Sequence, residues 1–300
     1  MLITKLEQIV EMLKNKPKKR LVVVYGQDSH SIGSTSKAID LGIVDVTLVG
    51  DEKKIKKVCN EMNIDPNKFT IVNEPEEIKS GLKAVQLINE GKGNAIMKGI
   101  ISTDNYMRVL LNKEVGLVPK GSILSHITVV ENPNMDRLLV VGDVAIIPYP
   151  DLKQKIAIAN YLINTTIKLG VEKPKLAVIA ATEKANPKMP ACVDASILSK
   201  MGDRGQIKNA IIDGPLALDV AIDKESAEIK GLKGEVPGNA DCLLFPNIEA
   251  GNVFYKSMTK LANSPLAAIV AGAKVPAILS SRGDSEETKL YSIALATLLG

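Results

Sequence analysis

The chain has 300 residues, of which 45% are hydrophobic and 24% are charged, and its formal net charge is +4. These values indicate a folded globular protein that is long enough for two domains, and the small, scattered charge argues against a nucleic-acid partner. Six Tyr, three Phe and no Trp also leave little basis for binding a ligand by base stacking.

The amino-terminal part of the chain alternates apolar strands with amphipathic helices. The predicted strands cover residues 21–25, 44–49, 69–72 and 94–97, and the predicted helices cover residues 2–13, 34–41, 52–62 and 76–89. Asp51 is placed to cap the third of these helices, and Thr103 is placed to cap a further helix that carries Arg108. Alternation at this spacing predicts a parallel sheet covered on both faces.

From Pro119 onward the pattern changes. Residues 123–130 and 138–141, separated by a turn, predict an antiparallel hairpin that marks the entry into a second domain. Later helices are predicted at 152–169 and 194–201, and strands at 176–181, 210–212, 243–245 and 267–271, which would complete a second α/β sheet. A last strand at 275–279 and a helix from Glu286 follow. We expect a first domain of residues 1–120 plus 271–300 and a second of residues 121–270.

The three cysteines, Cys59, Cys192 and Cys242, are isolated in the sequence. They indicate buried free thiols in a reducing cytoplasm rather than a disulfide framework or a zinc site. The amino terminus lacks the apolar core of a signal peptide, and the longest apolar run, at residues 266–279, is interrupted by Lys274. We therefore expect a cytoplasmic protein with no membrane partner.

Strand-to-helix junctions in this chain carry small residues and free backbone NH groups, and four basic side chains lie in or near them, a combination that binds anions at the carboxyl edge of a sheet. The basic residues are Lys98, Arg108, Lys256 and Arg282. Before Lys256 come the amides of Asn247 and Asn252 and a tight turn at Gly251, and Arg282 follows the hydroxyl of Ser281. Asn and Gly are common in any such loop, but the set as a whole indicates a phosphorylated ligand.

Motifs for other site classes are missing from the sequence. It has no Gly-x-Gly-x-x-Gly fingerprint, no P-loop, no Gly-x-Ser-x-Gly elbow and no residues at metal-ligand spacing. The two histidines are His30 and His126, and the apolar strand around His126 favours a buried structural role over a catalytic base. No metal site is predicted.

A set of motifs resembles the phosphate acetyltransferase and butyryltransferase family, from roughly residue 20 to the end of the chain. These motifs are Met97-Lys98-Gly99 with Thr103 and Arg108, Leu124-Ser125-His126, residues 186–190, residues 213–219, residues 246–252 and Ser281-Arg282-Gly283. The segments at Leu124, Asp213 and Pro246 are more similar to the butyryltransferase branch.

This resemblance implies two α/β domains with a cleft between them, similar to isocitrate and isopropylmalate dehydrogenases, in a homodimer or larger oligomer. The implied reaction is the reversible exchange of a butanoyl group between CoA and inorganic phosphate, with no cofactor besides the CoA thioester substrate. The implied catalytic residues are Ser281 and Arg282. The implied substrate-binding residues are Lys98, Thr103, Arg108, Asp213, Asn247, Gly251, Asn252 and Lys256.

One departure from the family pattern concerns the base. The acetyl branch places an aspartate, proposed as the base for the CoA thiol, seven residues after the serine, where this chain has Thr288.

Three alternative functions stay open: acetyl in place of butanoyl transfer, a decarboxylating dehydrogenase, and a non-catalytic CoA- or phosphate-sensing module. The dehydrogenase would need clustered aspartates for a metal and a nicotinamide site, and neither motif is present.

Overall fold

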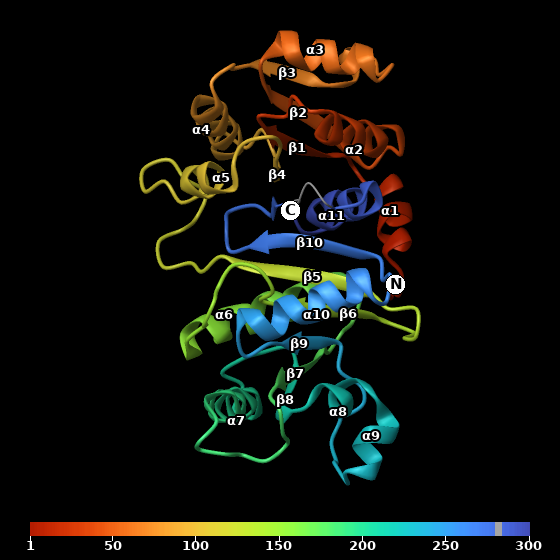
Figure 1. The fold of residues 1–300 in the computed structure, drawn as a ribbon, viewed down its shortest axis with the longest axis vertical. Helices are drawn as coiled ribbons and strands as arrows, with labels where there is room; N and C mark the ends of the chain where they lie inside the picture. The colour runs from red at the N-terminus through yellow and green to blue at the C-terminus, as the bar shows by residue number, and fades with distance from the viewer. Residues whose placement is uncertain (280–283) are drawn as a thin grey trace. The chain divides into compact units, whose positions relative to one another are not determined.

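Two separately packed units make up the chain, which a computed structural model describes over residues 1–279 and 284–300. The terminal unit comprises Leu6–Leu124 and Leu266–Gly300, and the central unit comprises Met1–Lys5 and Ser125–Pro265. Both units combine one set of hydrogen-bonded strands with flanking helices (Figure 1).

The terminal unit is built on parallel strands in the order β3-β2-β1-β4-β11, with β10 antiparallel to β11. Its strands are β1 (Lys19–Val24), β2 (Val44–Gly50), β3 (Thr70–Asn73), β4 (Ala95–Lys98), β10 (Leu266–Ala271) and β11 (Ala277–Ile278). Its helices are α1 (Leu6–Lys14), α2 (Ser29–Asp40), α3 (Glu52–Glu61), α4 (Glu77–Asn89), α5 (Thr103–Leu110) and α11 (Glu286–Leu299), with a 3-10 turn at Pro66–Lys68. The predicted parallel sheet is confirmed.

The central unit has the strand order β5-β6-β9-β7-β8. Its strands are β5 (Ser125–Glu131), β6 (Leu138–Gly142), β7 (Lys175–Ile179), β8 (Ile211–Leu216) and β9 (Cys242–Leu244). Its helices are α6 (Leu152–Lys168), α7 (Pro190–Asp203), α8 (Leu218–Ile222), α9 (Lys224–Ile229) and α10 (Ile248–Lys260). β5 and β6 are antiparallel, which confirms the predicted hairpin, and the other pairs are parallel.

Apolar strand residues form the cores of both units. In β1, Leu21, Val22, Val23 and Val24 are each 0% exposed, as expected for a β-branched strand covered on both faces. In the central unit, the rings of Phe245 and Phe254 lie 5.2 Å apart and join the end of β9 to α10. The three cysteines are free and buried, as predicted.

Several predicted boundaries were wrong. α2 begins at Ser29 rather than at residue 34, because the Asp28 side chain caps it by accepting from the Ser31 backbone NH at 2.9 Å. α7 begins at Pro190 rather than at 194, since proline is tolerated at the first helical position. β8 continues to Leu216 instead of ending at residue 212. Residues 266–271, which we expected in the second sheet, lie in the terminal unit and pair with β11.

Candidate active site

The end of β4 carries Lys98 at the carboxyl edge of the terminal unit's parallel strands. The Lys98 ammonium donates to the Gly99 carbonyl oxygen at 3.3 Å. A side chain at Gly99 would overlap the backbone carbonyl oxygens of Val24 and Tyr25, which would lie 2.6 Å from its Cβ. The loop after β4 therefore lies directly against the loop after β1, and only glycine fits between them.

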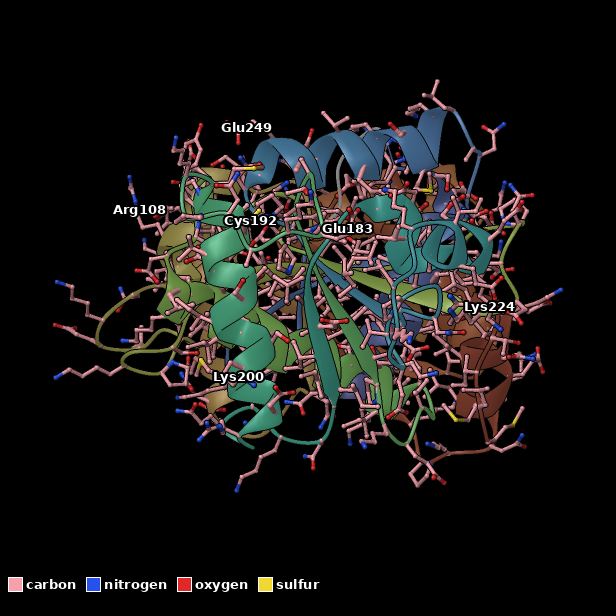
Figure 2. All side chains as sticks on the ribbon, turned by 90° about the horizontal axis from the view of Figure 1, so that it is seen from below. Arg108, Glu183, Cys192, Lys200, Lys224 and Glu249 are labelled. Atoms are coloured by element: carbon pink, nitrogen blue, oxygen red, sulfur yellow. The ribbon has the colours of Figure 1, made fainter. Side chains whose placement is uncertain are left out.

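Helix α5 presents two of the predicted site residues, Thr103 and Arg108, as exposed side chains. The predicted cap was wrong by one residue: Ser102, not Thr103, accepts from the Asn105 backbone NH at 3.2 Å. Because Ser102 supplies the cap, the Thr103 hydroxyl is not needed for it. Arg108 extends away from the ribbon (Figure 2), so its guanidinium is accessible to an anion.

A carboxylate and a buried tyrosine fix α5 on the unit. The carboxylate of Glu77 accepts from the Asn105 side chain at 2.9 Å and from the Ser102 backbone NH at 3.0 Å. These bonds hold the pKa of Glu77 below its usual range, with Lys98 contributing by charge. Tyr106 is 0% exposed, and its hydroxyl donates to the Ile96 carbonyl oxygen of β4 at 3.3 Å. The start of α5 is therefore held in place.

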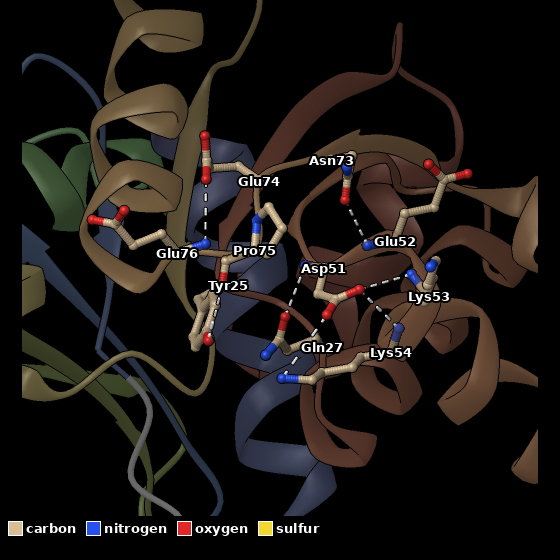
Figure 3. A network of polar contacts seen from close by, with 10 residues as sticks. All are labelled: Tyr25, Gln27, Asp51, Glu52, Lys53, Lys54, Asn73, Glu74, Pro75 and Glu76. Carbon is tan, nitrogen blue, oxygen red and sulfur yellow. Dashed lines mark hydrogen bonds and ion pairs between the residues drawn. The ribbon is translucent and has the colours of Figure 1, made fainter.

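The loops after β1, β2 and β3 are linked by side chains that bind backbone NH groups (Figure 3). Gln27 accepts from the Asp51 backbone NH at 2.8 Å, and Asn73 accepts from the Glu52 backbone NH at 3.0 Å. Asp51 caps α3 by accepting from Lys53 and Lys54, as predicted. Because its own carboxylate occupies the start of α3, that helix end is not available to an anionic ligand.

In the central unit, a buried carboxylate joins the ends of β5 and β6. Asp143 is 2% exposed and follows β6 directly. One of its oxygens accepts from the Ser125 hydroxyl at 3.0 Å and the His126 backbone NH at 3.1 Å. The other accepts from the Ala145 and Ile146 backbone NH groups at 2.7 and 2.9 Å. Four donors thus compensate the burial of this charge.

The start of α10 lies against the same segment. Asn247 caps the helix by accepting from the Ala250 backbone NH at 3.0 Å, and Asn252 donates its side-chain amide to the Val144 carbonyl oxygen at 3.1 Å. A methyl group at Gly251 would overlap the carbonyl oxygen of Asp143. Gly251 and Asn252 therefore fix α10 onto the residues that follow β6, and Asn247 caps the first turn of the helix.

Further along α10, an aromatic ring separates a cation from a histidine. The Lys256 ammonium lies 4.9 Å from the centre of the Tyr255 ring. His126 meets the same ring edge-on, with ring centres 6.3 Å apart, and its Nδ1 lies 3.2 Å from the Thr128 hydroxyl. His126 is 7% exposed, so the expected buried histidine is confirmed. The Lys256 side chain itself is exposed.

Asp213 lies within β8, which is an edge strand in the strand order of the central unit. Burial raises the pKa of its carboxyl, while a 2.8 Å hydrogen bond from the Gly214 backbone NH acts in the opposite direction. The two predicted catalytic residues, Ser281 and Arg282, lie outside the described residues.

Sequence reasoning missed Asp143. A signal was available, because this carboxylate comes directly after the buried strand residues 138–142, at the carboxyl end where ligand-binding loops gather.

Within the described residues, no group of three or more His, Cys, Asp or Glu side chains is arranged to hold a metal ion. None of the helices in the part of the chain that the structure describes is long and apolar enough to cross a membrane.

Comparisons with known proteins give consistent matches over nearly the whole chain. The family model described as phosphate acetyl/butaryl transferase matches residues 4–81 and 76–297. The chain is 46% identical to a phosphate butyryltransferase of Clostridium acetobutylicum, covering 99% of both chains. It is 39% identical to a phosphate acetyltransferase of Thermotoga maritima, covering 98% of this chain and 99% of that protein.

A solved structure is also similar over nearly the whole chain. The crystal structure of a branched-chain phosphotransacylase from Enterococcus faecalis superposes with a TM-score of 0.82 at 30% identity. The superposition covers 93% of this chain and 98% of that one, so the likeness extends over both units.

Proposed function

We propose, on the premise that this chain belongs to the phosphate acetyl/butaryl transferase family, that it converts butanoyl-CoA and inorganic phosphate reversibly into butanoyl phosphate and CoA. The observation that carries this proposal is the 46% identity, over 99% of both chains, to a protein named phosphate butyryltransferase. The protein is therefore an acyltransferase that takes an acyl-CoA and phosphate as its substrates.

The chemistry needs cations, an oxyanion donor and a stable leaving group. A phosphate oxygen attacks the thioester carbonyl carbon, the carbonyl oxygen becomes an oxyanion, and the carbon–sulfur bond then breaks to release the CoA thiolate. A thiol of pKa about 8.5 leaves as a thiolate with little help from an acid. We assign Arg282 and Arg108 to phosphate and Ser281 to the oxyanion.

The remaining predicted residues are assigned to substrate binding. In the terminal unit these are Lys98 and Thr103, and in the central unit they are Asp213, Asn247, Gly251, Asn252 and Lys256. The structure supports an exposed position for Thr103, Arg108 and Lys256. For Asn247, Gly251 and Asn252, the geometry supports a role in fixing the start of α10, from which the helix can present its free NH groups.

The test is the release of CoA thiol from a series of acyl-CoAs that differ in chain length, with and without phosphate. Phosphate-dependent release that is fastest with butanoyl-CoA is the expected result. A rate that peaks at acetyl-CoA would favour acetyl transfer, the alternative supported by the 39% identity to the phosphate acetyltransferase. Absence of phosphate-dependent release with every acyl-CoA would contradict both.

Assembly and location are part of the same proposal. The family resemblance supports a homodimer or larger homo-oligomer, and light scattering of the purified protein would contradict this if it gave the 32.1 kDa mass of one chain. The three buried free thiols support a reducing cytoplasm. Fractionation of the source cells tests that location.

A further inference from the structure

One aromatic ring of this chain is exposed. The structure describes all six Tyr and all three Phe, and apart from Tyr149 these side chains are buried or half-buried. Tyr149 is 72% exposed. It lies in the loop that follows β6, and β6 runs parallel to β9, so the loop shares the carboxyl edge of the central unit with the start of α10. The exposed ring therefore lies at the edge where the substrate-binding residues Asn247 and Asn252 are found.

A hydrogen bond fixes the position of this ring. The Tyr149 hydroxyl donates to a carboxylate oxygen of Glu249 at 2.6 Å, and Glu249 is the second residue of α10 (Figure 2). The bond raises the pKa of the Tyr149 hydroxyl and lowers the pKa of the Glu249 carboxyl. At neutral pH the pair is therefore a phenol and a carboxylate, which form a charge-assisted hydrogen bond. The ring is held beside the start of α10.

The loop that carries Tyr149 is fixed on both sides of the ring. Before the ring, the Pro148 carbonyl oxygen accepts from the Ile248 backbone NH at 3.0 Å. After it, Pro150 is buried, and Asp151 begins α6 with a capping box. Each proline also restricts its own backbone φ angle. Since the ring is held in one place before a ligand arrives, little conformational entropy is lost on binding.

Two further exposed groups follow the ring along α10. Glu249, Val253 and Lys256 are spaced at i, i+4 and i+7, so they lie on one face of the helix, and all three are exposed. Val253 is 66% exposed. At a rise of about 1.5 Å per residue, Lys256 lies about 10 Å along the helix from Glu249. This face of the central unit therefore presents an aromatic ring, an apolar side chain and an ammonium group in that order.

These groups match the nucleotide end of CoA. An adenine stacks on an aromatic face, and although the chain has few aromatic residues, one exposed ring is sufficient for one base. A phosphate is bound by an ammonium group. Because the Glu249 carboxylate repels phosphate, the adenine lies at the Tyr149 end of the face and the phosphates lie toward Lys256.

We infer that Tyr149 is a substrate-binding residue whose ring stacks on the adenine of the acyl-CoA, while Lys256 binds a phosphate of the same nucleotide. The inference rests on the proposed function, and it names the part of the substrate that this face of α10 recognises. All of the residues involved belong to the central unit.

The test compares butanoyl-CoA with butanoyl-pantetheine, a thioester that lacks the adenosine and all the phosphates of CoA. Tyr149→Leu removes the ring and is expected to raise the KM for butanoyl-CoA by about fivefold or more, with kcat and the KM for butanoyl-pantetheine unchanged. Tyr149→Phe keeps the ring and should retain most of the affinity. Lys256→Met should also raise the KM for butanoyl-CoA alone. Ile229→Ala, at an exposed apolar residue of α9, is the control and should change neither KM.

Other results would overturn the inference. An unchanged KM for butanoyl-CoA in Tyr149→Leu would show that the ring does not contact the substrate, and an equal rise for both thioesters would show that it does not bind the adenine. Unchanged KM values with a smaller oligomer in light scattering would assign the ring to a contact between copies of the chain.

Calorimetric titration of CoA gives a second measurement that does not depend on acyl transfer. Tighter binding of CoA by the parent and by Tyr149→Phe than by Tyr149→Leu is the expected result. Equal binding by all three proteins would overturn the inference even where the parent transfers acyl groups. A parent protein that binds no CoA would contradict the proposed function together with the inference.

Discussion

Asp143→Ala is expected to lower the free energy of unfolding by about 4 kcal/mol, because it leaves four buried donors without an acceptor. Those donors come from Ser125 and His126 on one side and from Ala145 and Ile146 on the other. The 2% exposure of Asp143 leaves little access for water to replace the carboxylate. Urea unfolding of the parent and the variant measures the difference.

Two further variants make this prediction specific. Asp143→Asn keeps one oxygen and turns an amide toward two of the donors, so its free energy of unfolding should lie between those of the parent and the alanine variant. Asp136→Ala removes a carboxylate whose side chain is 92% exposed, and it is expected to change stability by less than about 0.5 kcal/mol. A loss of under about 1 kcal/mol for Asp143→Ala would show that Asp143 does not hold these loops together.

Arg282→Lys is expected to cost about 2 to 4 kcal/mol of transition-state stabilisation, which is roughly a 30- to 1,000-fold loss in kcat/KM. The planar guanidinium donates to two phosphate oxygens at once, whereas the lysine ammonium interacts with phosphate only as a point charge. Steady-state kinetics with butanoyl-CoA and phosphate measures the loss. The same substitution at the exposed Arg204 is the control and should leave the rate unchanged. Near-parental turnover of Arg282→Lys would remove Arg282 from the phosphate site.

Local patterns predicted most of the fold. The Asp51 cap, the parallel strands of the amino-terminal part and the hairpin of residues 125–142 were all evident from residue type and spacing. The start of α2 was missed because its Ser- and Gly-rich sequence has low helix propensity, and packing of its buried face overrides that preference. The cap of α5 was misplaced because Ser102 and Thr103 are adjacent and each carries a hydroxyl group that can cap a helix.

The candidate site was harder to predict, since it depends on contacts between distant residues. Asp143 is recognisable only once β5 brings Ser125 against it, 18 positions away in the chain. Asn247 and Asn252 were recognised by residue type, but their protein partners, Ala250 and Val144, could not be deduced from the loop sequence.

The central claim is that phosphate attacks the thioester directly, with the chain contributing binding and charge but no covalent bond. Incubation of the protein with butanoyl-CoA and isotopically labelled CoA, in buffer free of phosphate, tests it most directly. The account predicts that no label enters butanoyl-CoA until phosphate is added, after which exchange follows the formation of butanoyl phosphate. Rapid label exchange without phosphate would reveal an acyl-enzyme intermediate and contradict direct transfer.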